Sequence, residues 1–160
     1  MAKLTFKQKV VGALSGGVLA ALSVTVIHFE GTRYTPYQDG GGVLTVCQGH
    51  TGGVKLGHTY TPEECDALRG VDLSKSLADA DRLSPGLPDK VRVAVADFIY
   101  NLGAGAYERS TLRRKINAGE GAKACEEFLH WDHIGKVQIR GLTIRRKFEY
   151  QLCVEGFEGR

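Results

Sequence analysis

Residues 28–52 read HFEGTRYTPYQDGGGVLTVCQGHTG, and within them an apolar helix gives way to a glycine-rich segment. Two acidic residues, Glu30 and Asp39, lie on either side of a short polar stretch, and Thr45 follows within the β-prone residues 43–46. Residues 39–42 form a strong turn signal between the β-prone pieces. Residues 31–57 therefore predict a small antiparallel sheet with glycine corners.

Helices dominate the chain after this sheet. Thr61-Pro62-Glu63-Glu64 predicts a helix start, in which Thr61 is the N-cap and Glu64 closes a capping box. Apolar residues at helical spacing continue to about Leu83, and a proline- and glycine-rich segment at 84–88 ends the helix. Residues 89–102 predict a largely buried helix, and shorter helices are expected at 110–118, 121–131 and 142–154.

These elements predict an α+β fold behind an N-terminal apolar segment at residues 1–28. The domain at 29–160 is expected to consist of a small β-containing lobe at about 29–65, a long connecting helix at about 62–83 and a larger helical lobe at about 88–160. The length of 160 residues suits one folded domain, and 42% hydrophobic with 24% charged residues excludes a disordered or fibrous chain.

The formal net charge of +3 is unevenly distributed along the chain. Lys3, Lys7 and Lys9 supply three positive charges at the extreme N-terminus, residues 30–100 carry −3 and residues 101–160 carry +3. The body behind the three lysines therefore has no net charge. It lacks the electrostatic footprint of a nucleic-acid-binding protein, so no nucleic-acid partner is expected.

The twenty residues 10–29 contain no Asp, Glu, Lys or Arg. This length can span a bilayer, and the preceding lysines predict a cytoplasmic N-terminus. Only nine of the residues 10–27 are aliphatic, however, so the insertion signal is marginal. Three interpretations remain open: a buried helix of a soluble protein, a secretory signal cleaved near Ala20-Ala21, or a weak uncleaved anchor that later leaves the membrane.

Four cysteines allow three disulfide pairings, or four buried free thiols. An export segment in front of the domain favours disulfides. Neighbouring elements then favour Cys47–Cys65 in the small lobe and Cys125–Cys153 in the helical lobe. No C-x-x-C pair and no histidine ligand spacing occur, so no metal site and no cofactor are expected.

Glu30 and Asp39 are the candidate catalytic pair. A carboxyl at the end of an apolar helix is partly desolvated, which favours its protonated form, whereas a carboxylate on an exposed turn stays ionised. Acid-catalysed glycoside cleavage needs two carboxyls in such different environments: one protonates the leaving oxygen, and the other stabilises positive charge or activates water. The hydroxyl of Thr45 is suited to hold that water. Two solvated surface acids at this spacing are the simple alternative.

Residues 30–52 resemble the active-site lobe of the phage-type muramidases, glycoside hydrolase family 24, which reads Glu, then Tyr-x-Asp, a Gly–Thr strand and Gly-His-Thr. The resemblance continues in order through residues 98–103, 110–113, Trp131 and 141–146. It implies a lysozyme-like fold, with Glu30 as general acid, Asp39 as its partner carboxylate and Thr45 positioning the attacking water. The substrate implied is the β-1,4 bond between N-acetylmuramic acid and N-acetylglucosamine in peptidoglycan, hydrolysed with inversion.

The same resemblance suggests supporting residues. Tyr37 is expected to line the cleft, His50 to pair with Asp72 as a structural contact, and Arg145 or Arg146 to reach the carboxylate of Glu30. Packing of the turn aromatic and solvation of the arginines on a helix face are the alternatives. Cys47 stands where many relatives have glycine, which leaves the backbone there undetermined.

The N-terminal segment resembles that of the signal-arrest-release endolysins of tailed phages. This implies a protein tethered to the host inner membrane through residues 10–27 and then released into the periplasm. The direct join of this segment to Glu30 suggests the control: in lipid, the segment keeps Glu30 at the membrane surface, and release lets the helix pack onto the second lobe. The apolar run holds no cysteine, so disulfide exchange is not the expected control.

Two alternative functions are kept. A lytic transglycosylase acts on the same substrate but needs one acid and no water-positioning pair. A cell-wall-binding protein with a muramidase-like body has no turnover. In each case we expect a monomer whose partner is bacterial peptidoglycan.

Overall fold

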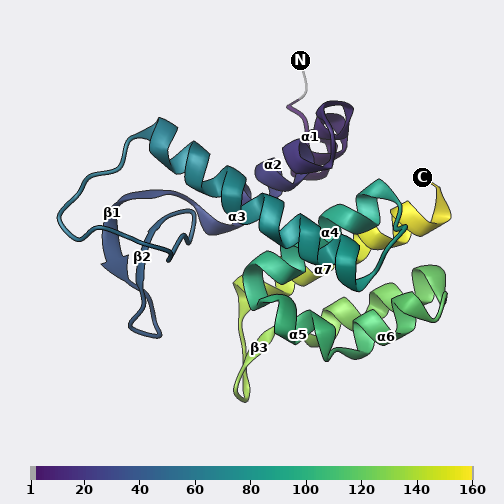
Figure 1. The fold of residues 1–160 in the computed structure, drawn as a ribbon. Helices are drawn as coiled ribbons and strands as arrows, with labels where there is room; N and C mark the ends of the chain where they lie inside the picture. The colour runs from purple at the N-terminus through teal and green to yellow at the C-terminus, as the bar shows by residue number, and fades with distance from the viewer. Residues whose placement is uncertain (1–2, 160) are drawn as a thin grey trace.

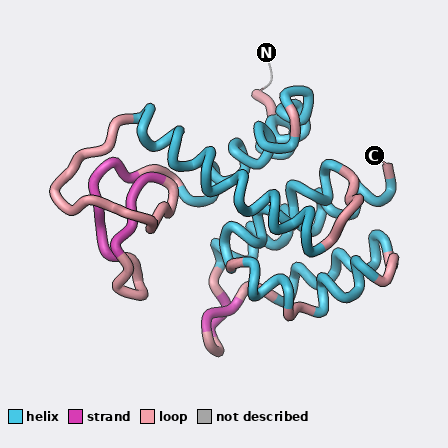
Figure 2. Tube along the Cα trace, viewed as in Figure 1, coloured by secondary structure: helices cyan, strands magenta, loops and turns pink. Residues whose placement is uncertain are grey.

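The computed structural model describes residues 3–159, which form a small β lobe and a larger helical lobe joined by a long helix (Figures 1 and 2). The elements in chain order are α1 (Phe6–Ala13), η1 (Leu14–Gly16), α2 (Val18–Glu30), β1 (Arg33–Gln38), β2 (Leu44–Cys47), α3 (Pro62–Leu83), α4 (Asp89–Leu102), α5 (Ala104–Glu108), α6 (Thr111–Asn117), η2 (Gly121–His130), β3 (His133–Ile134), β4 (Val137–Gln138) and α7 (Arg140–Glu158). This is the predicted α+β, lysozyme-like architecture.

The small lobe is built on the antiparallel pair β1–β2. Tyr37 pairs with Thr45 and Gln38 with Leu44, and a register irregularity separates these pairs from Arg33, which pairs with Cys47. The sheet is followed by a loop at 48–61 that consists mainly of turns and irregular structure (Figure 2).

The connecting helix α3 begins and ends where the sequence predicts. Thr61 Oγ1 accepts a hydrogen bond from the backbone N–H of Glu64 at 3.1 Å, and Glu64 Oε2 accepts one from the backbone N–H of Thr61 at 2.7 Å. This reciprocal capping box, with Pro62 at the first helical position, satisfies N–H groups that no helical partner reaches.

The core of the helical lobe surrounds α4, which packs against α2, α3 and α7. The apolar N-terminal segment belongs to this same core, because Val10, Ala21, Leu22 and Val26 are fully buried in it. Glu30, the last residue of α2, is therefore held by the packing of the helical lobe.

The N-terminal segment is two helices rather than the single apolar helix that residues 10–27 predict. The break lies at η1 and Gly17, whose φ of +100° is a conformation that glycine adopts readily and other residues avoid. The break lets α1 fold back on α2, where the ring of Phe6 stacks on His28 at 3.7 Å between centroids. Within residues 3–159, no helix has the length and apolar character needed to cross a membrane.

Other local predictions are confirmed or corrected. Helices α4 and α6 occupy the predicted ranges, and α7, predicted at 142–154, extends to Arg140–Glu158. The predicted helix at 121–131 is instead a 3₁₀ segment at Gly121–His130, and the β3–β4 hairpin that follows was not predicted. That hairpin is too short, at two residues a strand, to show an alternating pattern.

The two favoured disulfides are confirmed. Cys47 is bonded to Cys65 across 18 residues, and Cys125 to Cys153 across 28. The first ties the end of β2 to the first turn of α3, and the second ties η2 to α7. Loops of these lengths stabilise a protein by roughly 3–4 kcal/mol each in the chain-entropy treatment.

A substitution at Gly156 can test how closely α7 approaches α4. A Cβ at this position would lie 2.7 Å from Val91 Cγ2 and 3.0 Å from the Val91 backbone nitrogen. We therefore expect Gly156→Ala to lower the free energy of unfolding by about 1–3 kcal/mol, because the two helices would have to separate. Chemical unfolding followed by circular dichroism measures this.

Gly70, within α3, is the matched control because a Cβ there has no heavy atom within 4 Å. Gly70→Ala should be neutral or stabilising by up to about 1 kcal/mol, since alanine favours the helix. Equal stability of the two variants would contradict the packing described for α4 and α7.

Candidate active site

Glu30 lies at the end of α2, at the edge of a pocket of about 410 Å³. The pocket is formed by the last residues of α2, by Asn101 of α4 and by the first turns of α7. The Glu30 side chain is 26% exposed, and its Oε1 accepts a hydrogen bond from Nη1 of Arg145. Of the two arginines considered from the sequence, Arg145 is the one that reaches Glu30.

Asp39 lies in the turn after β1 and is exposed. Its Oδ1 accepts hydrogen bonds from the backbone N–H groups of Gly41 and Val43, each at 2.9 Å. These two donors fix the orientation of the carboxyl group. The glycines after Asp39 allow the turn to fold back onto its side chain.

Thr45 lies on β2, directly opposite Tyr37 of β1. Thr45 is almost fully buried, and its hydroxyl donates to the carbonyl of Val43 at 2.9 Å, which leaves the oxygen's lone pairs available as acceptors. Tyr37 is half-buried, and the guanidinium of Arg33 lies 4.4 Å from its ring centroid. Within residues 3–159, no hydrogen bond or ion pair joins Glu30 to Asp39 or Thr45.

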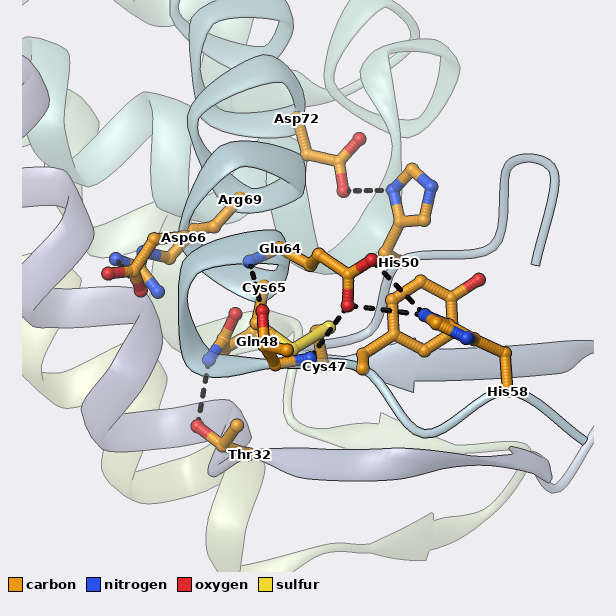
Figure 3. The surroundings of a disulfide bond; sticks show 12 residues. Thr32, Cys47, Gln48, His50, His58, Glu64, Cys65, Asp66, Arg69 and Asp72 are labelled. Carbon is orange, nitrogen blue, oxygen red and sulfur yellow. Dashed lines mark hydrogen bonds and ion pairs between the residues drawn. A yellow bond between two sulfur atoms is a disulfide. The ribbon is translucent and has the colours of Figure 1, made fainter. Parts of the chain in front are cut away.

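Polar contacts attach the small lobe to α3 and α4. His50 Nδ1 lies 2.7 Å from Asp72 Oδ2, the pair expected from the sequence (Figure 3). His50 Nε2 lies 2.6 Å from the carbonyl of Gly52. Gln48 Nε2 donates to Thr32 Oγ1 at 2.8 Å, and the backbone carbonyl of Gln48 accepts a hydrogen bond from the hydroxyl of Tyr100 at 2.5 Å. Burial raises the pKa of Tyr100, so this hydroxyl remains a donor.

A buried ionic cluster lies behind Glu30, and sequence reasoning missed two of its members, Asp97 and Glu149. Asp97 accepts hydrogen bonds from Arg145 Nε at 2.9 Å and Nη2 at 2.8 Å. Glu149 Oε2 lies 3.2 Å from Arg146 Nη1, and Arg146 Nη2 donates to Asn101 Oδ1 at 2.5 Å. The one available signal was an acidic residue within the otherwise apolar stretch 93–99.

The cluster is almost entirely shielded from water. Asp97, Arg146 and Glu149 are fully buried, and Arg145 is 4% exposed. Burial by itself would raise the pKa of Asp97, but the charge and hydrogen bonds of Arg145 outweigh it and hold that pKa below its usual range. Burial raises the pKa of Glu149 well above its usual range despite the charge of Arg146.

The arrangement of two lobes, with one carboxyl at the end of α2 and a second in the turn after β1, is that of a lysozyme-type enzyme. Residues 27–149 match the sequence model of the family described as phage lysozyme. The chain therefore belongs to the phage lysozyme family of peptidoglycan-degrading enzymes, and its role is in phage lysis.

Individual relatives agree with this assignment. The SAR-endolysin of Bacteriophage PS119 is 41% identical over 161 residues, which cover 94% of this chain and 95% of the relative. The P22 lysozyme, solved as a mutant, is 28% identical with a TM-score of 0.73 and covers 96% of this chain and 99% of its own. The active form of the P1 phage endolysin Lyz has the same fold, at 22% identity and a TM-score of 0.76, over 98% of this chain and 97% of its own.

Cys47 offers a test of the backbone at the end of β2. Its φ of +60° makes it the one non-glycine residue with a left-handed backbone among those described. We expect Cys47→Gly/Cys65→Ser to exceed Cys47→Ser/Cys65→Ser in stability by about 1 kcal/mol, because glycine adopts this conformation without the steric penalty.

Both double variants lack the disulfide and should lie about 3 kcal/mol below the oxidised wild type. Thermal unfolding of the three proteins measures the order. A glycine variant no more stable than the serine variant would show that the backbone at position 47 carries no strain.

Proposed function

We propose that this protein is a muramidase that hydrolyses the β-1,4 bond between N-acetylmuramic acid and N-acetylglucosamine, with Glu30 as general acid. The observation that carries the proposal is the contrast between the two carboxyls. The Glu30 side chain is 26% exposed at the edge of a pocket in the helical lobe and is paired with Arg145, whereas Asp39 lies in an exposed turn and accepts two backbone N–H groups. Groups held in such different environments suit the separate roles of acid and ionised partner.

In the proposed reaction, Glu30 transfers its proton to the glycosidic oxygen as the bond to the anomeric carbon breaks. Asp39 stabilises the positive charge that develops on the sugar and takes the proton of the attacking water. Thr45 holds this water through the free lone pairs of its hydroxyl oxygen, and Tyr37 lines the cleft beside it. Attack from the side opposite the leaving group gives inversion.

A lytic transglycosylase is the alternative reaction on the same bond. It would use the C6 hydroxyl of the muramic acid in place of water and would leave a 1,6-anhydro product. The short strand that carries Thr45 and the ordered Asp39 turn have no role in that reaction, so they favour hydrolysis. A binding protein without turnover is disfavoured because Glu30, Asp39 and Thr45 are all present.

Glu30→Gln is the direct test of the acid, because glutamine has the same shape but no proton to transfer. We expect clearing of purified peptidoglycan to fall by at least about 10²-fold while the thermal midpoint changes little. Glu63→Gln is the matched control, since Glu63 is an exposed glutamate on α3. Soluble products analysed by mass spectrometry should carry reducing ends.

Undiminished clearing by Glu30→Gln would place the acid elsewhere. Products with 1,6-anhydro ends would replace the muramidase with a transglycosylase. Loss of clearing in both Glu30→Gln and Glu63→Gln would indicate a general effect of the substitution.

We further propose that residues 10–27 hold the enzyme inactive at the host inner membrane until they leave the lipid and α1 and α2 dock in the helical lobe. Support comes from the three N-terminal lysines, the uncharged run and the name of the PS119 relative, SAR-endolysin. While the segment lies in lipid, Glu30 stays at the membrane surface, away from the small lobe. The released protein then acts in the periplasm.

Contacts outside the apolar core would form only in the docked state. Lys7 Nζ lies 2.5 Å from Glu155 Oε1 of α7, and Arg69 Nε donates to Ser23 Oγ at 2.9 Å. Phe6 also packs on Phe148 of α7, at 4.7 Å between centroids. Cleavage near Ala21 would remove part of α2 and the whole of α1, so we propose that the segment is retained.

Gly17 provides a test of this switch. Gly17→Leu adds apolar surface and disfavours the left-handed break by about 1–2 kcal/mol, which shifts the equilibrium toward the membrane about 5- to 30-fold. We expect a smaller periplasmic fraction and later lysis, measured by fractionation and culture turbidity.

Gly12→Leu is the control, because it adds the same side chain at an exposed position within α1 and leaves the break intact. Release and lysis by Gly17→Leu at wild-type rates would contradict the switch. So would full activity of the protein that remains in the membrane fraction.

A further inference from the structure

Asp97 and Arg145 form a bidentate ion pair that determines which edge of the guanidinium faces Glu30. Both oxygens of Asp97 are occupied, one by Nε and one by Nη2 of Arg145, at 2.9 and 2.8 Å. The remaining nitrogen, Nη1, is therefore the one that donates to Glu30. The guanidinium also lies over the ring of Phe29, 5.2 Å from its centroid, which limits its tilt.

The charges of this cluster show why Arg145 needs a second carboxylate, Asp97, in addition to Glu30. Arg145 with Glu30 alone would be a close ion pair, and such a pair draws the proton off a general acid. Asp97 is fully buried, so its charge is poorly screened by water and balances that of Arg145. Burial raises the pKa of Glu149 well above its usual range, so Asp97 rather than Glu149 is the buried counter-charge of Arg145.

We propose that Asp97 is a positioning residue of the reaction: it fixes the Arg145 guanidinium and supplies its counter-charge, so that Arg145 orients Glu30 without ionising it. This inference rests on the proposed role of Glu30 as acid. The other charged or titratable groups around Glu30 are Arg146 and Glu149 of α7, Tyr100 of α4 and His28 of α2. None of them holds Arg145 through two hydrogen bonds.

Asp97→Asn keeps the shape of the side chain but removes its charge and one of its two acceptors. Arg145 is then left with Glu30 as its nearest solvent-facing counter-ion. We expect the high-pH limb of the kcat/KM profile to move down by about one pH unit, and activity at pH 7 to fall about tenfold. The assay is release of soluble muropeptides from purified peptidoglycan.

Two further variants make the result specific. The first is Asp97→Asn combined with Glu149→Gln, which removes the carboxyl that could ionise to replace the lost charge of Asp97. The high-pH limb of the kcat/KM profile should still move down in this double variant. Asp81→Asn is the matched control, because Asp81 also forms a bidentate pair, with Arg92 Nε and Nη2 at 2.9 Å each, far from the pocket. This control should leave the pH profile in place.

A measurement on the wild type covers the case in which Asp97→Asn does not fold. In a ¹³C NMR titration of side-chain carboxyls, Asp97 should stay ionised to below its usual range, as its lowered pKa requires. Protonation of Asp97 near neutral pH would overturn the proposal, because a neutral Asp97 supplies no counter-charge.

The proposal would also be overturned if the high-pH limb did not move in a folded Asp97→Asn variant. A uniform loss of rate at every pH would assign Asp97 a purely structural role. Glu30→Gln separates these outcomes from failure of the proposed function. If Glu30→Gln is inactive and the Asp97 variants have the wild-type limb, only the inference about Asp97 fails.

Discussion

Glu30 is the last residue of α2, so the packing of one apolar helix determines where the proposed acid lies. Burying Val10, Leu22 and Val26 in the helical lobe is worth about 1.5–3 kcal/mol for each side chain. The aliphatic residues of 10–27 gain about 3–5 kcal/mol on entering a bilayer, before the glycines and hydroxyls subtract from it. Packing of these three side chains thus gains about as much as, or more than, membrane insertion of all the aliphatic residues, so the same residues are suited both to a weak anchor and to a protein core.

The end of this helix meets a second constraint, the buried charges of α4 and α7. A lone arginine buried beside Glu30 would be costly, and its partners Asp97 and Glu149 come from two different helices. The close approach of these helices at Gly156 keeps the pairs together. In the docked protein, α2 therefore brings Glu30 to the charged side chains of α4 and α7.

Local signals in the sequence were sufficient for much of this structure. The capping box at Thr61 predicted the start of α3, and the apolar spacing after Asp89 predicted α4, because these features depend on neighbouring residues. The two disulfides followed from which elements are adjacent. The resemblance to phage-type muramidases supplied the pairing of His50 with Asp72 and the expectation that Arg145 or Arg146 reaches Glu30, and the structure shows that it is Arg145.

The remaining features depend on contacts between distant residues. Gly17 looks like any small residue in an apolar run, and only the return of α1 onto α2 requires its left-handed backbone. Asp97 and Arg145 are 48 residues apart, so nothing near either one reveals their pairing.

Spin labels at Leu19 of α2 and Val71 of α3, both exposed in the docked protein, would test directly whether docking of the N-terminal segment creates the active enzyme. Pulsed electron resonance would measure the distance between them in vesicle-embedded and in released protein, with peptidoglycan hydrolysis assayed on the same samples. We expect one short, narrow distance in active, released protein and its loss in inactive, embedded protein. The same short distance in both samples, or full activity without it, would contradict this mechanism.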